Sequence, residues 1–335
     1  MATKIASHHS SAEEHAHKKP THPAPAPKPS APTASTATYT LVTEPDQGLT
    51  AIYNLLSSAK KSIDVTIYEL TDATVISTLG KAAAAGLTVR VILDQNSEKM
   101  TNTPAYDTLT EAKVSVHWAN PAYTFTHQKT ITVDQATSAI MTLNLTPVDY
   151  ASTRDFAVIT NDPADVAAIE TTFNADFQNA TITPPAGDNL IWSPTNSRSA
   201  ITALIGGAAK TLLISQEEFS DAGMEGAVEA ALKRGVAVTL VQEDIDSEYT
   251  AALTALKDLG AKIAVYTSSK GYYIHAKTVL ADYGTAQAKL FLGSENFSTD
   301  SLNKNRELGL IFSDSACMAG VQATITADYN NGTKF

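Results

Sequence analysis

Cysteine is nearly absent from this sequence of 335 residues. Cys317 is the single cysteine, which excludes an intramolecular disulfide framework and a cysteine-rich zinc site. Long hydrophobic runs are also missing. Although 43% of the residues are hydrophobic, no run approaches the ~18 apolar residues of a membrane span. The composition predicts a packed core, in one large domain or two of ordinary size.

Positive charge is scarce as well. The chain has 24 lysines and arginines against 35 aspartates and glutamates, which gives a net charge of −11. An acidic chain gains nothing from non-specific attraction to phosphates, so a protein that coats nucleic acid is not expected. A local basic cleft remains compatible with this total.

Residues 1–39 differ from the rest of the chain. They are rich in His, Pro, Ala, Ser and Thr and have little apolar surface to bury, so they are predicted to form a disordered linker. A functionless, solvated tail is favoured over weak metal binding by its histidines, which are His8, His9, His15, His17 and His22. No apolar signal segment is visible in residues 1–40, yet the composition favours a secreted or periplasmic protein.

The remaining chain contains an internal repeat. Four blocks recur in the same order at a nearly constant offset, for example 221 − 72 = 149. The paired blocks are 59–72 with 208–221, 82–94 with 230–242, 113–120 with 262–269, and HQKTITVD with IHAKTVLAD. Four matches in one order indicate a duplicated domain. We expect a first domain at 40–183 and a second at 184–335, joined through the proline-rich segment TITPPAGDNL.

Each half alternates apolar strands with helices, which predicts two α/β/α sandwiches with mixed sheets. Helices are expected at 73–85, 163–177, 222–234 and 315–329. Strands are expected at 62–70, 87–93, 113–119, 127–134, 138–144 and 155–160, and at 211–218, 236–242, 262–267, 288–293 and 307–312, with another beginning at His275.

A histidine and a lysine open one strand in each half. His127 and Lys129 are two residues apart, as are His275 and Lys277, and this spacing places both side chains on one face of a strand. A single histidine on a strand is usually structural, but an inward lysine is unusual because an unpaired buried ammonium is costly. The repetition of the pair favours a functional site.

Further polar residues follow each pair at matching positions. Asn144 and Asn296 lie in turns, and Asp155 and Glu307 come 11 residues after them (155 − 144 = 11 and 307 − 296 = 11). We expect these carboxylates to accept a hydrogen bond from the far nitrogen of each imidazole. The arginines that precede them in sequence, Arg154 and Arg306, are expected to point elsewhere and form structural ion pairs.

Two histidines, two lysines and two asparagines suit a phosphate group. One neutral imidazole can attack phosphorus, while the other donates a proton to the leaving alkoxide. Lys129, Lys277, Asn144 and Asn296 would hold the nonbridging oxygens. Because protein cations do this work, no metal or other cofactor is required.

Asp134 and Asp282 complete the pattern H-x-K-x4-D in each half. They come seven residues after the histidine, which on a regular strand places them on the opposite face and about 23 Å away. We expect them to be structural, closing a turn or binding backbone groups.

The paired H-x-K-x4-D motifs, each followed by Asn and an acid, resemble the phospholipase D superfamily. GSENFSTDSLNKNRELGL is similar to the region after that family's second motif. The resemblance implies two fused α/β/α domains with a pseudo-twofold active site between them. It also implies a two-step mechanism through phosphohistidine, with His127 as nucleophile and His275 as acid. TLN replaces the family's glycine-rich turn before Asn144. Asp155 replaces the usual glutamate and is expected to need a shifted strand or a water molecule.

The superfamily acts on several phosphodiesters, so the motif leaves the substrate open. We expect a monomeric phospholipase D-type hydrolase that contacts membrane surfaces transiently, possesses no membrane anchor and has some transphosphatidylation activity. A metal-independent endonuclease is the alternative, and a non-catalytic binding protein is a third hypothesis. Aromatic and apolar residues near the motifs either line a lipid entrance or belong to the core. These residues are Trp118, Tyr123, Phe125, Tyr272, Tyr273 and Ile274.

Overall fold

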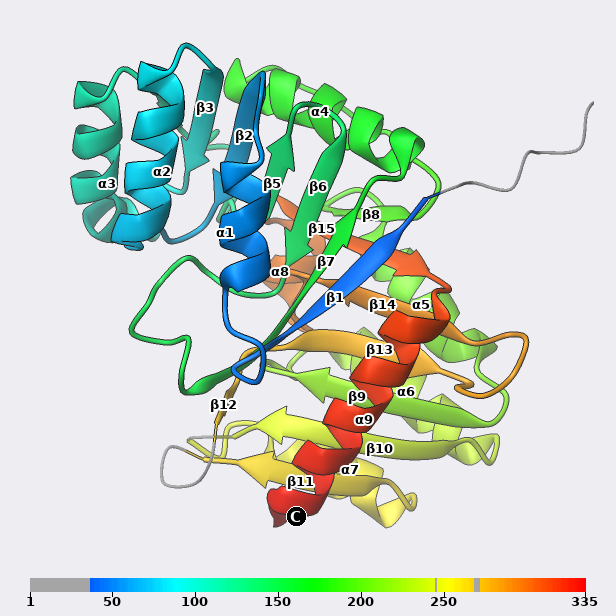
Figure 1. Cartoon of the computed structure of the whole chain (residues 1–335). Coiled ribbons are helices and arrows are strands. Elements are labelled where there is room, and N and C mark those ends of the chain that lie inside the picture. Colours follow the sequence, from blue (N-terminus) through cyan, green and yellow to red (C-terminus); the bar gives the residue numbers. More distant parts are fainter. Residues whose placement is uncertain (1–36, 245, 268–271) are drawn as a thin grey trace, which may run out of the picture. The chain divides into compact units, whose positions relative to one another are not determined.

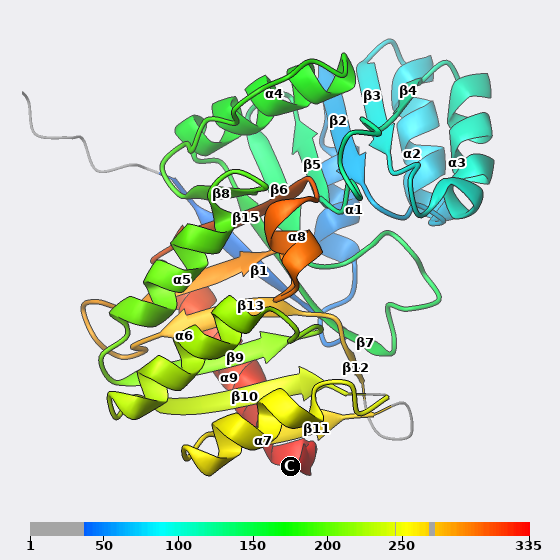
Figure 2. The same ribbon diagram turned by 180° about the vertical axis from the view of Figure 1, so that it is seen from behind.

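Two mixed β-sheets form the framework of the computed structural model, which describes residues 37–244, 246–267 and 272–335 (Figures 1 and 2). The first sheet has the order β1 (Tyr39–Glu44), β7 (Thr153–Thr160), β6 (Thr137–Met141), β5 (Thr130–Val133), β2 (Ser62–Ile67), β3 (Thr88–Leu93) and β4 (Ser115–Trp118). The second has the order β8 (Leu190–Ser193), β15 (Glu307–Phe312), β14 (Lys289–Gly293), β13 (Lys277–Ala281), β9 (Thr211–Gln216), β10 (Ala237–Glu243), β11 (Lys262–Tyr266) and β16 (Thr333–Lys334).

The two sheets repeat one topology. In the first, β2, β3 and β4 pair in parallel, whereas β5, β6, β7 and β1 pair antiparallel. The strands β9 to β11 and β13 to β15, with β8, reproduce this pattern in the second. The predicted duplicated fold with mixed sheets is therefore confirmed.

Helices cover both faces of each sheet (Figures 1 and 2). In the first half they are α1 (Thr50–Ser57), α2 (Ala73–Ala84), α3 (Lys99–Glu111) and α4 (Pro163–Phe177). In the second half they are α5 (Ser197–Gly207), α6 (Ala222–Lys233), α7 (Thr250–Asp258), α8 (Thr299–Asn303) and α9 (Ser315–Asn331). None of the helices in the described part of the chain has both the length and the apolar character needed to cross a membrane.

Local sequence explains where the repeated helices begin and end. Asp72 and Asp221 each precede a helix and accept hydrogen bonds from the first free backbone N–H groups, with a shortest distance of 2.7 Å at Thr74. Gly86 and Gly235 follow the same helices with φ of +89° and +90°, a conformation that glycine adopts without a Cβ penalty. Both helices therefore match the predicted ranges to within one residue.

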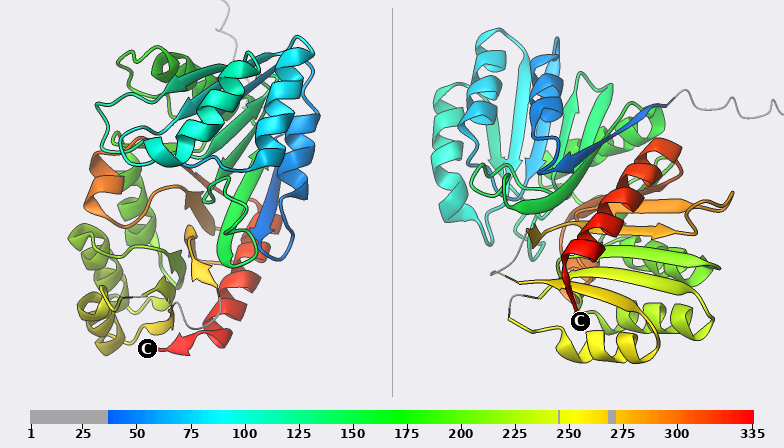
Figure 3. Two further views of the ribbon diagram at one scale, coloured as in Figure 1. Left: turned by 90° about the vertical axis from the view of Figure 1, so that its left-hand side faces the viewer. Right: turned by 60° about the horizontal axis from the view of Figure 1, so that its bottom comes forward.

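The hydrophobic core is divided into layers. One cluster packs α1, α2 and α3 against the first sheet, and another packs α5, α6 and α7 against the second. A third cluster contains residues of both halves, such as Phe156 and Trp192. Helix α9 takes part in this shared core and also lies against β1 of the first sheet (Figure 3). The shared layer holds the two sheets together.

Some predicted boundaries were wrong. The strand expected at 127–134 begins only at Thr130, and His275 precedes β13, which begins at Lys277. The expected strands 62–70 and 211–218 end at residues 67 and 216. The predicted linker at 1–39 lies outside the described residues up to residue 36, and so do its histidines. The domain limits remain a prediction.

Candidate active site

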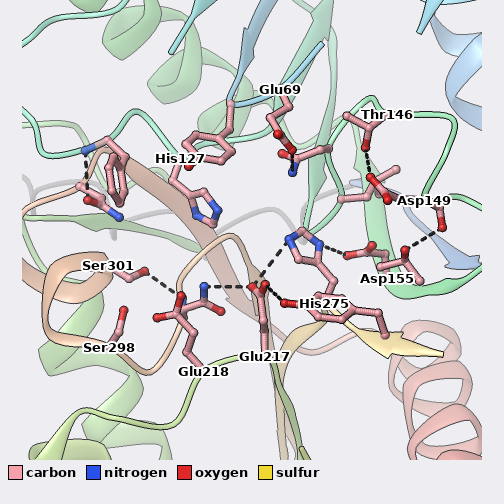
Figure 4. Close-up of a pocket in the computed structure, with 18 of the residues that line it drawn as sticks. Glu69, His127, Thr146, Asp149, Asp155, Glu217, Glu218, His275, Ser298 and Ser301 are labelled. Carbon is pink, nitrogen blue, oxygen red and sulfur yellow. Dashed lines mark hydrogen bonds and ion pairs between the residues drawn. The ribbon is translucent and has the colours of Figure 1, made fainter. Parts of the chain in front are cut away.

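A pocket of about 830 Å³ opens between the two halves and contains both motif histidines (Figure 4). Its lining also includes Asn144, Asn296 and Asp155. Residues from the two predicted halves therefore meet at one place.

The segment that carries each motif histidine forms backbone hydrogen bonds with the opposite half. The backbone N–H of His127 donates to the carbonyl of Arg306 over 3.0 Å, and that of His275 donates to the carbonyl of Arg154 over 3.1 Å. In the second half, the short strand β12 (Tyr273–Ile274) pairs in parallel with β7 of the first half. Each histidine is thus positioned by the opposite half, which explains why neither belongs to a strand of its own sheet.

His127 is paired with a carboxylate from the other half. Its Nδ1 lies 2.9 Å from Oε2 of Glu307. The other carboxylate oxygen of Glu307, Oε1, accepts hydrogen bonds from Ser301 and Asn305. Burial lowers the pKa of His127, although Glu307 opposes this shift. Burial would raise the pKa of Glu307, but His127 and Lys129 lower it below its ordinary value. A neutral imidazole that donates from Nδ1 carries its lone pair on Nε2.

His275 shows the reciprocal arrangement. Its Nδ1 lies 2.9 Å from Oδ1 of Asp155, and Thr142 also donates to that oxygen. The expectation that the shorter aspartate needs a shifted strand or a water was wrong. Asp155 reaches the imidazole directly because the backbone pairing of His275 with Arg154 brings the ring next to it.

The two lysines lie behind the histidines and are almost fully buried. Lys129 and Lys277 each donate from Nζ to the carbonyl of the histidine two residues earlier, over 2.7 Å at Lys129. Burial and the charge of Lys277 lower the pKa of Lys129 to about 7. Neither lysine belongs to the pocket lining in the described part of the chain.

Two glutamates that the sequence interpretation missed contact the predicted phosphate donors. Asn144 donates from Nδ2 to Glu69 over 2.7 Å, and Asn296 donates to Glu217 over 3.1 Å. Oε2 of Glu217 also lies 2.8 Å from Nζ of Lys277. Burial and nearby Glu98 raise the pKa of Glu69 to about 7.

Burial would raise the pKa of Glu217, but Lys277 and His275 outweigh burial and hold it below its ordinary value. A signal for these residues exists in the sequence. Glu69 and Glu217 both follow the carboxyl end of a central strand in the aligned blocks 59–72 and 208–221. The carboxyl ends of parallel strands are a common place for binding sites.

Asp134 and Asp282 lie away from the pocket. Each has a positive φ and accepts hydrogen bonds from three successive backbone N–H groups, beginning at Lys60 and Ala209 respectively. These contacts tie the turn after the motif strand to the start of the neighbouring strand. The hydrogen bonds of Asp134 and Asp282 are therefore made to the backbone, as expected for structural residues.

The two arginines are also absent from the described lining of the pocket. Arg154 pairs with Asp328 of α9 over 2.7 Å, and Arg306 pairs with Asp176 of α4 over 2.9 Å. The first ion pair joins the first half to α9 of the second half, and the other joins the second half to α4 of the first. The prediction of structural ion pairs is confirmed.

The aromatic and apolar residues near the motifs divide into two groups. Phe125 and Tyr273 line the pocket. The others belong to packing: Trp118 stacks on Tyr106, Tyr123 and Tyr272 cover Arg306 and Arg154, and Ile274 is fully buried. No cluster of three or more His, Cys, Asp or Glu side chains suited to a metal ion occurs among the described residues.

Comparison with known proteins identifies the relationship. The family described as "Cardiolipin synthase, PLD-like domain" matches residues 52–177 and 201–329. The chain belongs to the phospholipase D superfamily. Both matched segments contain one H-x-K-x4-D motif, in agreement with the duplication. A search of curated proteins finds no significant sequence match.

Two solved structures share the fold of the chain. Polyphosphate kinase from Porphyromonas gingivalis has a TM-score of 0.69 and 16% identity, covering 87% of this chain and 50% of that chain. Phosphatidylserine synthase from Haemophilus influenzae has a TM-score of 0.69 and 14% identity, covering 89% of this chain and 87% of that chain. The chain therefore spans half the length of the kinase. At these identities the likeness concerns the fold.

Proposed function

We propose that this protein is a phospholipase D-type phosphodiesterase that hydrolyses the headgroup phosphodiester of phospholipids. One observation carries the proposal: His127 and His275 share one pocket, and each is bound at Nδ1 by a carboxylate of the opposite half. This arrangement leaves two Nε2 atoms for chemistry at a single phosphorus.

The reaction proceeds in two steps. Nε2 of His127 attacks phosphorus and forms a P–N bond, while the P–O bond to the leaving alcohol breaks and Nε2–H of His275 protonates that oxygen. His275 then takes a proton from water, whose oxygen attacks phosphorus and breaks the P–N bond. Glu307 and Asp155 orient the two rings. An alcohol in place of water gives transphosphatidylation.

The charge of the pocket supports a phospholipid over a nucleic acid. Among the described lining residues there is no lysine or arginine. The acidic ones are Glu44, Glu69, Asp149, Asp155, Glu217, Glu218 and Asp300. A polyanionic strand with phosphates on both sides of the scissile bond would meet these carboxylates, whereas a lipid presents one phosphodiester. A lipid substrate also requires transient contact with a membrane surface.

The test measures phosphatidic acid and headgroup release from phosphatidylcholine vesicles beside nicking of a supercoiled plasmid, both with EDTA. Lipid hydrolysis without nicking is the expected result. Nicking without lipid hydrolysis would replace the proposal with the endonuclease alternative. The variant with both His127→Ala and His275→Ala should lose any activity that is found.

A further inference from the structure

Glu217 occupies the donors that the sequence assigns to substrate phosphate in the second half. Its Oε2 lies 2.8 Å from Nζ of Lys277, 3.1 Å from Nδ2 of Asn296 and 3.6 Å from Nε2 of His275. Its Oε1 accepts a hydrogen bond from the Tyr273 hydroxyl over 2.8 Å. A carboxylate therefore lies where nonbridging phosphate oxygens were expected (Figure 4).

In the first half a carboxyl group, that of Glu69, accepts a hydrogen bond from Asn144, but among the described residues no carboxylate forms an ion pair with Lys129. Tyr68 aligns with Glu217 (217 − 68 = 149), and the ammonium of Lys129 lies 4.9 Å from the centre of its ring. In the described part of the chain, Lys277 forms an ion pair and Lys129 does not. The two halves thus differ in their capacity for anions, and the first is better suited to hold the phosphate.

Glu217 presents negative charge to the pocket. The Lys277 side chain has 0% exposure and lies behind it, whereas the Glu217 side chain is 16% exposed. The pKa of Glu217 is held low, while burial raises the pKa values of Glu69 and Glu44 to about 7. Glu217 is therefore ionised at neutral pH. Glu69 and Glu44, in contrast, take up protons as the pH falls through about 7.

Asn296 gives a second indication of the ligand. It is 4% exposed and lines the pocket, and its amide nitrogen is bound to Glu217. Its amide oxygen, like that of Asn144 in the first half, has no hydrogen-bond partner among the described residues. A buried acceptor without a donor is unfavourable, and a ligand that carries N–H or positive charge relieves it.

We propose that Glu217 is a specificity-determining residue that selects phosphodiesters whose leaving alcohol carries a cationic group. The inference rests on the proposed function, in which Nε2 of His275 protonates the leaving oxygen. Because Glu217 lies 3.6 Å from that nitrogen, the substituent of the leaving alcohol is released beside its carboxylate. A cation there is attracted to Glu217 and to the ring of Tyr273, which is 38% exposed. A neutral or anionic substituent lacks this attraction.

The experiment uses two soluble short-chain lipids that differ in one atom. One is dihexanoyl phosphatidylcholine, and the other is its 3,3-dimethylbutyl ester, in which carbon replaces the quaternary nitrogen. The ratio of the two kcat/KM values for phosphatidic acid release should be about tenfold or more in favour of choline. Glu217→Gln should bring this ratio close to one.

Glu229→Gln is the matched control, because it makes the same substitution on the exposed face of α6, where Glu229 contacts only Lys233 in the described ion pairs. It should keep the wild-type ratio. If Glu217→Gln does not fold, inhibition of the wild type decides the question, since choline should inhibit more strongly than 3,3-dimethylbutanol.

A wild-type ratio near one, with hydrolysis of both lipids, would overturn the role of Glu217 and leave the proposed function standing. A preserved preference in folded Glu217→Gln would overturn it as well. Absence of hydrolysis of both lipids by the wild type would instead reject the proposed function.

Discussion

The two halves share one topology and the same motif residues, yet they surround these residues differently. Tyr68 in the first half corresponds to Glu217 in the second, and Leu143 corresponds to Glu295 (295 − 143 = 152, as 296 − 144 = 152). Among the described residues, His127 contacts a carboxylate at Nδ1 alone, whereas His275 has carboxylates near both ring nitrogens. Duplication has kept the motif residues, and divergence of their neighbours separates the environments of the two histidines.

The largest effect should come from the histidines. His127→Ala and His275→Ala should each lower the turnover of phosphatidylcholine by about 10³-fold or more, because each removes a reacting group.

Bis(p-nitrophenyl) phosphate separates their roles, since its leaving group needs no proton. With this substrate, His275→Ala should still form a phospho-enzyme and His127→Ala should not. Trapping of the labelled protein in SDS at alkaline pH, where a P–N bond to histidine is stable, measures this. Phospho-enzyme in His127→Ala alone would reverse the assignment.

The next largest loss of activity should come from Glu307 and Asp155, each of which binds the histidine of the opposite half. Glu307→Gln and Asp155→Asn should each lower kcat by about 10²- to 10⁴-fold, because an amide no longer fixes the tautomer of its imidazole. Double-mutant cycles test the crossing: Glu307→Gln should be non-additive with His127→Ala and Asp155→Asn with His275→Ala. The mechanism also predicts that Glu307→Gln, but not Asp155→Asn, slows phospho-enzyme formation from bis(p-nitrophenyl) phosphate. Equal slowing by both variants would contradict the assignment of Glu307 to the nucleophile.

Asp134 and Asp282 offer a comparison in which the halves should behave alike. Asp134→Asn and Asp282→Asn should each lower the free energy of unfolding by about 1–3 kcal/mol at pH 7, because charged acceptors of backbone N–H groups are lost. Backbone hydrogen bonds overcome burial and lower both pKa values in the folded state. The stabilisation is therefore present above the ordinary value of 3.8 and disappears as the pH falls through the lowered values.

Urea unfolding from pH 7 to pH 3 measures this effect, with the exposed Asp258→Asn as control. Activity per folded molecule should be unchanged in both variants. A loss of kcat without a loss of stability would show that these aspartates act at the reaction centre after all.

The smallest expected effect concerns Glu295, which takes the position of Leu143 in the first half. It is fully buried, both carboxyl oxygens lack partners among the described residues, and burial together with Glu307 raises its pKa well above 4.5. A raised pKa in the folded state favours folding below the ordinary value, and this contribution is lost as the pH rises. Glu295→Leu, which copies Leu143, should therefore raise the unfolding free energy by at least about 1 kcal/mol more at pH 8 than at pH 5. An equal change at the two pH values would show that Glu295 is not neutral in the folded protein.

The sequence by itself determined the duplication, the repeated helices and the positions of the motif residues. These features depend on local signals: apolar periodicity, the caps Asp72 and Asp221, the glycines that end the helices, and the spacing of each motif. The tertiary structure alone decided which carboxylate binds which histidine. His127 and Glu307 are 180 residues apart, and His275 and Asp155 are 120 apart. Their contacts depend on how two sheets dock through a shared core, for which the spacing within one half gives no signal. The same docking places Glu217 next to both Lys277 and His275. The position of Glu217 after a strand does not predict these two contacts.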